Sequence, residues 1–201
     1  MSEFTMTWQE FSKDAEDFLK IAERLKDNWS WHQKDADDGN GYLLYKHKID
    51  FPNEERIEIQ KDSSEISDIA ISNELLEACP DNDLLQIEYH IVYSISYQVP
   101  VLYFLAHKSD GSLLQLEDAW RLFSTFGNDT QPKSRAEMLS ILTQMEHPVL
   151  FRPFLGLHPC RTAELLSQSS ASRNHLLTFI SLMGPYIQLK LANEYGLEIA
   201  K

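Results

Sequence analysis

The sequence is poor in cysteine, in basic residues and in long apolar runs, and each shortage excludes a class of protein. Two cysteines, Cys79 and Cys160, are too few for a disulfide scaffold in a chain of 201 residues. Lys and Arg total 18 against 31 Asp and Glu, so the formal net charge is -13. This balance argues against nucleic acid or an anionic membrane surface as a partner, because both require a basic face, and it suits a protein partner with a basic patch. No run of eighteen or more apolar residues occurs, so we expect no membrane span.

The cellular location and the domain organisation follow from the same composition. No basic segment followed by an apolar one occurs at the N-terminus, so no secretory signal is expected. With both thiols free, the cytoplasm is the predicted location. The apolar content fits a sizeable core, and we expect residues 1–201 to form a single domain. Residues 62–83 are acidic and rich in serine, which predicts a flexible loop.

Hydrophobic periodicity predicts helices packed against an antiparallel sheet. Thr7 and Glu10 form a capping-box pattern at the start of the first helix, and Gly184-Pro185 should kink or split the last one. The expected elements are helices at 8–27, 116–126, 135–143 and 172–191 and strands at 29–32, 42–49, 85–97, 99–106 and 154–157. The longest strand should present on one face Ile87, Tyr89, Ile91, Tyr93, Ile95 and Tyr97. The order predicts an α+β fold, mainly an antiparallel sheet packed by an N-terminal helix and C-terminal helices.

The tripeptide His158-Pro159-Cys160 follows the short apolar strand expected at 154–157. Proline fixes its own φ and biases the preceding residue away from helix, so the Cys160 thiol should leave the strand end in a defined direction. Rigid strand ends commonly position reactive groups on the loops that follow them. A structural interpretation stays open on these residues alone, because a free cysteine is often a small buried hydrophobe.

Two segments together resemble the ubiquitin-conjugating enzymes of autophagy, the family of autophagy-related protein ten. One is the tyrosine-rich strand pair from Glu88 to Phe104, and the other runs from Gln144 through His158-Pro159-Cys160 to Thr162. The resemblance covers nearly the whole chain, with 62–83 as its least familiar part, and it implies a ubiquitin-conjugating-enzyme-like core. A sister family, which conjugates modifier eight to phosphatidylethanolamine, shares His-Pro-Cys. Its members are longer and have a membrane-sensing N-terminus, so it is kept as an alternative.

The resemblance implies transthiolation followed by aminolysis, without a cofactor. Cys160 would accept the C-terminal glycine of ubiquitin-like modifier twelve from an E1-like activating enzyme, as a thioester. A lysine of autophagy protein five would then attack that thioester and form an isopeptide bond. Whether modifier eight is also accepted is left open.

Three further residues are candidates for supporting the Cys160 thiol. We expect His158 to be mainly structural, with a ring that anchors the turn by hydrogen bonding. Ordinary ubiquitin-conjugating enzymes place an oxyanion-supporting asparagine after His-Pro, whereas here the cysteine itself follows, so another group must act. The resemblance implies that Tyr97 positions the lysine or the oxyanion, with a half-buried sheet tyrosine as the alternative. It also implies a polar amide upstream of the cysteine, for which Gln144 is the best match, although the residue is not asparagine.

Other classes of protein find weaker support in the residues. A zinc site would have to combine His147, His175 and Cys160, whose spacing fits no standard ligand pattern, so no metal is expected. A cysteine hydrolase would need a base histidine and an orienting Asp or Asn, and the sequence selects neither. A non-catalytic module that binds the modifier would offer its tyrosine-rich strand for β-augmentation.

Overall fold

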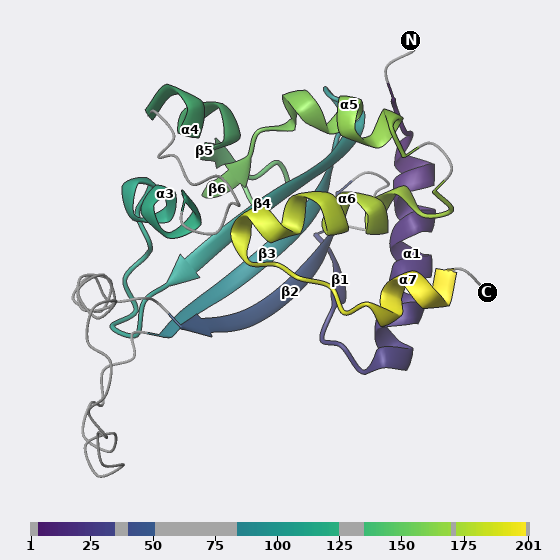
Figure 1. The fold of residues 1–201 in the computed structure, drawn as a ribbon, viewed down its shortest axis with the longest axis horizontal. Coiled ribbons are helices and arrows are strands. Elements are labelled where there is room, and N and C mark those ends of the chain that lie inside the picture. Colours follow the sequence, from purple (N-terminus) through teal and green to yellow (C-terminus); the bar gives the residue numbers. More distant parts are fainter. Residues whose placement is uncertain (1–3, 35–39, 51–83, 125–134, 170–171, 200–201) are drawn as a thin grey trace, which may run out of the picture.

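A computed structural model describes residues 4–34, 40–50, 84–124, 135–169 and 172–199 as a six-stranded antiparallel sheet with helices on one face (Figure 1). The helices are α1 (Trp8–Leu25), α3 (Leu116–Ser124), α4 (Arg135–Ile141), α5 (Thr162–Ser167), α6 (His175–Met183) and α7 (Glu194–Ile199). The strands are β1 (Ser30–Gln33), β2 (Gly41–Asp50), β3 (Leu84–Ser94), β4 (Val99–His107), β5 (Leu142–Glu146) and β6 (Pro153–Leu157). Their spatial order is β1-β2-β3-β4-β6-β5. The predicted α+β class is confirmed, while the acidic segment 62–83 lies outside the described residues.

Helix α1 begins as predicted and supplies much of the main core. The Thr7 hydroxyl accepts a hydrogen bond from the Glu10 backbone N–H (3.2 Å), and the Thr7 N–H donates to the Glu10 carboxylate (2.6 Å). The helix buries one stripe against the sheet, formed by Phe11, Ala15, Phe18, Ile21 and Ala22. Opposite them lie the alternate residues of the central strands, among them Leu43, Ile87, Tyr89, Ile91, Leu102 and Phe104.

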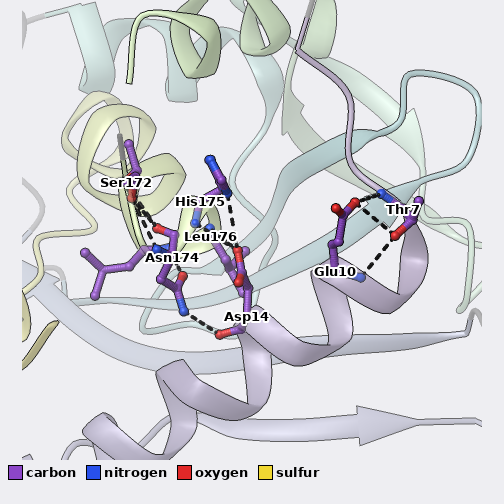
Figure 2. A network of polar contacts seen from close by, with 9 residues as sticks. Thr7, Glu10, Asp14, Ser172, Asn174, His175 and Leu176 are labelled. Atoms are coloured by element: carbon purple, nitrogen blue, oxygen red, sulfur yellow. Dashed lines mark hydrogen bonds and ion pairs between the residues drawn. The ribbon is translucent and has the colours of Figure 1, made fainter. Parts of the chain in front are cut away.

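A network of hydrogen bonds connects α1 to the first turn of α6 (Figure 2). The Asp14 carboxylate accepts hydrogen bonds from the backbone N–H groups of His175 (2.8 Å) and Leu176 (3.4 Å). Asn174 caps the same helix by accepting from the Leu177 N–H (2.7 Å), and its side-chain amide donates to the Asp14 carbonyl (2.8 Å). Burial raises the pKa of Asp14, and the two backbone donors partly offset that shift. These hydrogen bonds hold the start of α6 against α1.

The face of the sheet opposite α1 and α6, here called the second face, has a smaller core of its own. Its buried residues are Tyr42, Leu44, Val92, Val101, Tyr103, Val149 and Phe154. Val149 belongs to the turn between β5 and β6, and Leu150 of the same turn packs against this cluster. The β5–β6 turn therefore covers part of the second face.

The prediction of a regular strand through Tyr97 was wrong. β3 and β4 pair as far as Ser94 and Val99, so the four residues between them have to reverse the chain. Ile95 and Tyr97 consequently leave the predicted buried face and are 76% and 49% exposed. Gln98 closes the turn with φ 52°, and its N–H donates to the Ser94 carbonyl (2.7 Å).

Two predicted helices were too long. The segment expected as one helix at 135–143 ends at Ile141 and continues as the edge strand β5, because residues 142–146 pair with β6. The predicted helix at 172–191 is confirmed only over α6. Gly184-Pro185 does split it, and a 3₁₀ turn, Gly184–Ile187, follows. The short helix α5 was not predicted.

Candidate active site

Cys160 lies in a 3₁₀ turn, Pro159–Arg161, that joins β6 to α5. The strand before it is buried over Phe154–Leu157 and is held between β4 and β5, so the turn starts from a rigid base. Pro159 occupies the first position of the turn. A backbone N–H at this position would have no partner within the turn, so proline, which lacks an N–H, costs no hydrogen bond there. Cys160 itself is a free, exposed cysteine. The alternative of a small buried hydrophobe is therefore wrong, although the residue sits just beyond the strand rather than on it.

His158 caps this turn. Its backbone is extended (φ -66°, ψ 126°), and its ring Nδ1 accepts a hydrogen bond from the Cys160 N–H (3.2 Å). Its own N–H donates to the Ile141 carbonyl (2.8 Å), and this bond also holds the chain in place at the end of β6. With Nδ1 accepting, the neutral ring carries its proton on Nε2 and has no free lone pair to take a proton from the thiol. This geometry agrees with the expected structural role and disfavours a general base.

Tyr97 reaches the same turn from the β3–β4 connection. Its ring stands edge-on to the His158 ring, with the centroids 6.4 Å apart. The connection is held from two sides: the Tyr97 N–H donates to the Ser94 hydroxyl (3.3 Å), and the Met6 N–H donates to the Gln98 carbonyl (2.9 Å). Tyr97 thus lies in a turn beside the cysteine-bearing turn, and the alternative that places it in the sheet is wrong.

Gln144 lies apart from this group. It is an exposed residue of β5 and pairs with Leu155, whereas Leu142 pairs with Leu157 at the cysteine end of the hairpin. The structure therefore brings Tyr97, His158 and Cys160 together and leaves Gln144 farther back along the strand.

Sequence reasoning missed the residues that hold Tyr97 in place. These residues are Ser94, whose hydroxyl accepts from the Tyr97 N–H, and Met6, whose N–H donates to the Gln98 carbonyl. The Met6 carbonyl also accepts from the Tyr93 hydroxyl (2.8 Å), so the segment before α1 is anchored to the end of β3. No local signal marks this contact, because its partners are separated by almost ninety residues.

The three residues considered for a metal site lie in different places, with Cys160 in the turn after β6. His147 is buried beneath the second face next to His90, and His175 lies at the start of α6 beside Asp14. Within the described ranges no group of three or more His, Cys, Asp or Glu could hold a metal ion. Nor does any helix in that part of the chain have the length and apolar character needed to cross a membrane.

Comparison with known proteins identifies the family. A family model described as "Autophagocytosis associated protein, active-site domain" matches residues 10–194. The chain is 31% identical over 217 residues to the human "Ubiquitin-like-conjugating enzyme ATG10", covering 92% of this chain and 90% of the relative. The chain belongs to the ATG10 family. An Arabidopsis thaliana ATG10 is 32% identical over 166 residues, covering 76% of this chain and 70% of the relative.

The fold of the ATG10 family agrees with the architecture described above. A crystal structure of an autophagic E2, Atg10, superposes with a TM-score of 0.51 at 17% identity, covering 90% of this chain and 94% of the other. As a member of the ATG10 family, the chain is an E2-like conjugating enzyme of autophagy, a transferase that works with an E1-like enzyme and a ubiquitin-like modifier.

Proposed function

We propose that Cys160 carries ubiquitin-like modifier twelve as a thioester and passes it to a lysine of autophagy protein five. The Cys160 thiolate attacks the thioester carbonyl that joins the modifier's C-terminal glycine to the activating enzyme, and the thiolate of that enzyme leaves. The acceptor amine then attacks the new thioester, the Cys160 thiolate leaves, and the amine loses a proton as the isopeptide bond forms. The single observation that supports this proposal best is the free, exposed thiol on a rigid turn.

Tyr97 and His158 are given separate roles in this proposal. The Tyr97 hydroxyl, on an exposed ring beside the turn, orients the incoming lysine or donates to the oxyanion of the tetrahedral intermediate. His158 holds the Cys160 backbone through its Nδ1 and takes no proton from the thiol. Gln144 receives no role, because it pairs with Leu155 away from the other three.

We further infer one conjugating domain over 1–201, which the family match across 10–194 supports. We place its reaction in the cytoplasm, because a reducing compartment keeps an exposed catalytic thiol free.

A reconstituted reaction tests which modifier and which acceptor are used. The purified chain, the activating enzyme, ATP and modifier twelve are incubated with autophagy protein five, and conjugates are separated under reducing conditions. We expect a conjugate that resists reduction. A parallel reaction supplies modifier eight and vesicles that contain phosphatidylethanolamine. Exclusive formation of the lipid conjugate in that reaction would contradict the proposal and favour the sister activity.

Single-turnover transfer from the charged enzyme tests the role of Tyr97. Tyr97→Phe should be charged normally and should transfer more slowly, by about tenfold or more, because one hydrogen-bond donor is lost near the reacting carbonyl. Tyr186→Phe is the matched control, since Tyr186 is equally exposed (48% against 49%) but lies in the turn after α6. Equal transfer rates for the two variants would remove Tyr97 from the mechanism.

A further inference from the structure

The turn that carries Tyr97 contains a residue in an unfavourable backbone conformation. Gln98, directly after Tyr97, has φ 52°, in the left-handed region that residues with a side chain adopt only rarely. Residues 95–98 are all exposed, so packing of their own side chains does not hold the turn in this shape. A strained conformation persists only where the surroundings enforce it, and such positions are concentrated at functional sites.

Backbone hydrogen bonds enforce the conformation, from inside the turn and from outside it. Inside the turn, the Gln98 N–H donates to the Ser94 carbonyl (2.7 Å) and the Tyr97 N–H donates to the Ser94 hydroxyl (3.3 Å). From outside, the Met6 N–H donates to the Gln98 carbonyl (2.9 Å). Rotation of Gln98 out of the left-handed region would turn this carbonyl away from Met6. The segment before α1 therefore holds the strained residue in place.

Met6 is itself fixed, by a tyrosine of β3. Its side chain is buried in the main core (3% exposed), and its carbonyl accepts a hydrogen bond from the Tyr93 hydroxyl (2.8 Å). The Tyr93 ring packs against the start of α1, with its centroid 6.0 Å from that of Trp8 and 5.8 Å from that of Phe11. This packing directs the hydroxyl toward Met6. Both backbone polar groups of Met6 are thus bonded to the end of β3 and the turn that follows it.

The position of Tyr97 beside the thiol depends on this arrangement. Because the turn is exposed, the direction of the Tyr97 ring follows from the backbone on either side of it, and Gln98 is the next residue. The ring stands edge-on to His158, whose Nδ1 accepts from the Cys160 N–H. A displacement of about 1 Å at a group that acts on a transition state is enough to reduce the rate severely. Loss of a bond that holds the turn should therefore reach the reaction through Tyr97.

We propose that Tyr93 and Met6 are positioning residues for Tyr97 in the transfer of the modifier from Cys160 to the acceptor lysine. The Tyr93 hydroxyl holds the Met6 backbone, and Met6 holds Gln98 in the left-handed conformation. Gln98 then sets the direction of the Tyr97 ring. The effect is confined to transfer, because the turn that bears the thiol is built separately, on β6. The proposal rests on the proposed function, since it acts through the role given there to Tyr97.

Single-turnover transfer from the charged full chain tests Tyr93. Tyr93→Phe removes the hydroxyl and keeps the ring that packs against α1. Tyr89→Phe is the matched control, because Tyr89 is a buried tyrosine of the same strand whose hydroxyl donates to another backbone carbonyl, that of Ile187 (2.8 Å). Both variants should be charged at the wild-type rate and should lose a similar few degrees of thermal stability. Only Tyr93→Phe should transfer more slowly, by about threefold or more.

A double variant separates positioning from a general loss of structure. If Tyr93 acts through Tyr97, the variant that combines Tyr93→Phe with Tyr97→Phe should transfer at the rate of Tyr97→Phe alone, within about 1.5-fold. Two independent effects would multiply instead, and a multiplied loss would overturn the proposal.

The Ser94 hydroxyl offers a rescue test of the same turn. Ser94→Ala removes the acceptor of the Tyr97 N–H and should slow transfer, whereas Ser94→Thr keeps a hydroxyl and should restore it. Equal transfer rates for the two variants would show that the backbone of the turn does not position Tyr97, and would overturn the proposal.

The outcomes distinguish this proposal from the proposed function. Wild-type transfer by Tyr93→Phe, when Tyr97→Phe is slow, would overturn the positioning role alone. Equal slowing by Tyr89→Phe, or an equal slowing of charging in Tyr93→Phe, would also overturn it, because the loss would then reflect general destabilisation. Wild-type transfer by Tyr97→Phe would overturn the role of Tyr97 and this proposal with it. Failure of the wild-type enzyme to be charged would overturn the proposed function itself.

Discussion

Mild acid should destabilise the protein through the buried histidine pair beneath the second face. Burial, followed by the neighbouring charges of His90 and Arg152, lowers the pKa of His147 to about 3. Burial also lowers the pKa of His90. In the unfolded chain each ring regains a pKa of about 6.5. At a pH between the folded and the unfolded pKa of a ring, the unfolded chain binds a proton on that ring and the folded chain does not. The free energy of unfolding therefore falls as the pH falls below about 6.5.

The size of the effect follows from that linkage. A histidine that stays neutral in the folded protein and has an unfolded pKa of about 6.5 costs about 1.4 kcal/mol at pH 5.5 and less than about 0.1 kcal/mol at pH 7.5. Glu88 contributes little over this interval. Hydrogen bonds from His90 and Lys46 lower its pKa to about 2, so its carboxylate begins to weaken the fold only nearer pH 4.5.

Urea unfolding at pH 7.5 and pH 5.5 measures this loss directly. The control variant is His147→Gln, which removes the titrating ring and keeps a polar side chain at the site. Its loss of stability between the two pH values should be smaller than that of the wild type by about 1.4 kcal/mol. If the two proteins lose equal stability, the folded protein does not exclude a proton from the buried His147 ring, and the predicted cause of the acid sensitivity is wrong.

Three substitutions and one control variant test the packing and the helix caps, each by urea or thermal unfolding. Gly184→Ala would place its Cβ 2.3 Å from the Leu189 carbonyl oxygen, so we expect a loss of about 1–3 kcal/mol, whereas Gly196→Ala meets nothing within 4 Å and should be neutral or slightly stabilising. Equal effects of the two would contradict the close approach. Asp14→Ala should cost about 1–3 kcal/mol by removing the acceptor for two backbone N–H groups of α6. An unchanged unfolding midpoint would show that these hydrogen bonds do not stabilise the protein. Thr7→Ala should cost about 1 kcal/mol through loss of the capping box, and no measurable loss would show that the cap is not used in solution.

Local sequence patterns predicted those elements whose structure is decided locally. The capping box before Trp8 and the split at Gly184-Pro185 both depend on neighbouring residues, and both are found. β5 was missed because Leu142–Glu146 suits a helix in isolation and becomes a strand only through pairing with β6. The same limit explains Ile95, where apolar and polar residues continue to alternate although the chain has already turned.

The candidate site shows the same difference between features that depend on neighbouring residues and features that depend on contacts between distant ones. Cys160 became a candidate from His-Pro-Cys after an apolar run taken together with the tyrosine-rich strand pair, because the tripeptide alone left a structural cysteine open. The contact of Tyr97 with His158 joins residues about sixty positions apart, and the resemblance suggested a role for Tyr97 but not this neighbour. The conformation of Gln98 had no signal, because a residue with a long side chain gives no reason to expect a positive φ.

Formation of a thioester on Cys160 is the most direct test of the central claim. The chain is mixed with the activating enzyme, modifier twelve and ATP, and the products are separated on a non-reducing gel. We predict a slower band that dithiothreitol removes, that Cys160→Ala abolishes, and that Cys160→Ser converts into an ester resistant to dithiothreitol. If the wild-type chain forms no adduct while the activating enzyme demonstrably carries the modifier on its own cysteine, Cys160 is not the carrier and the account is contradicted.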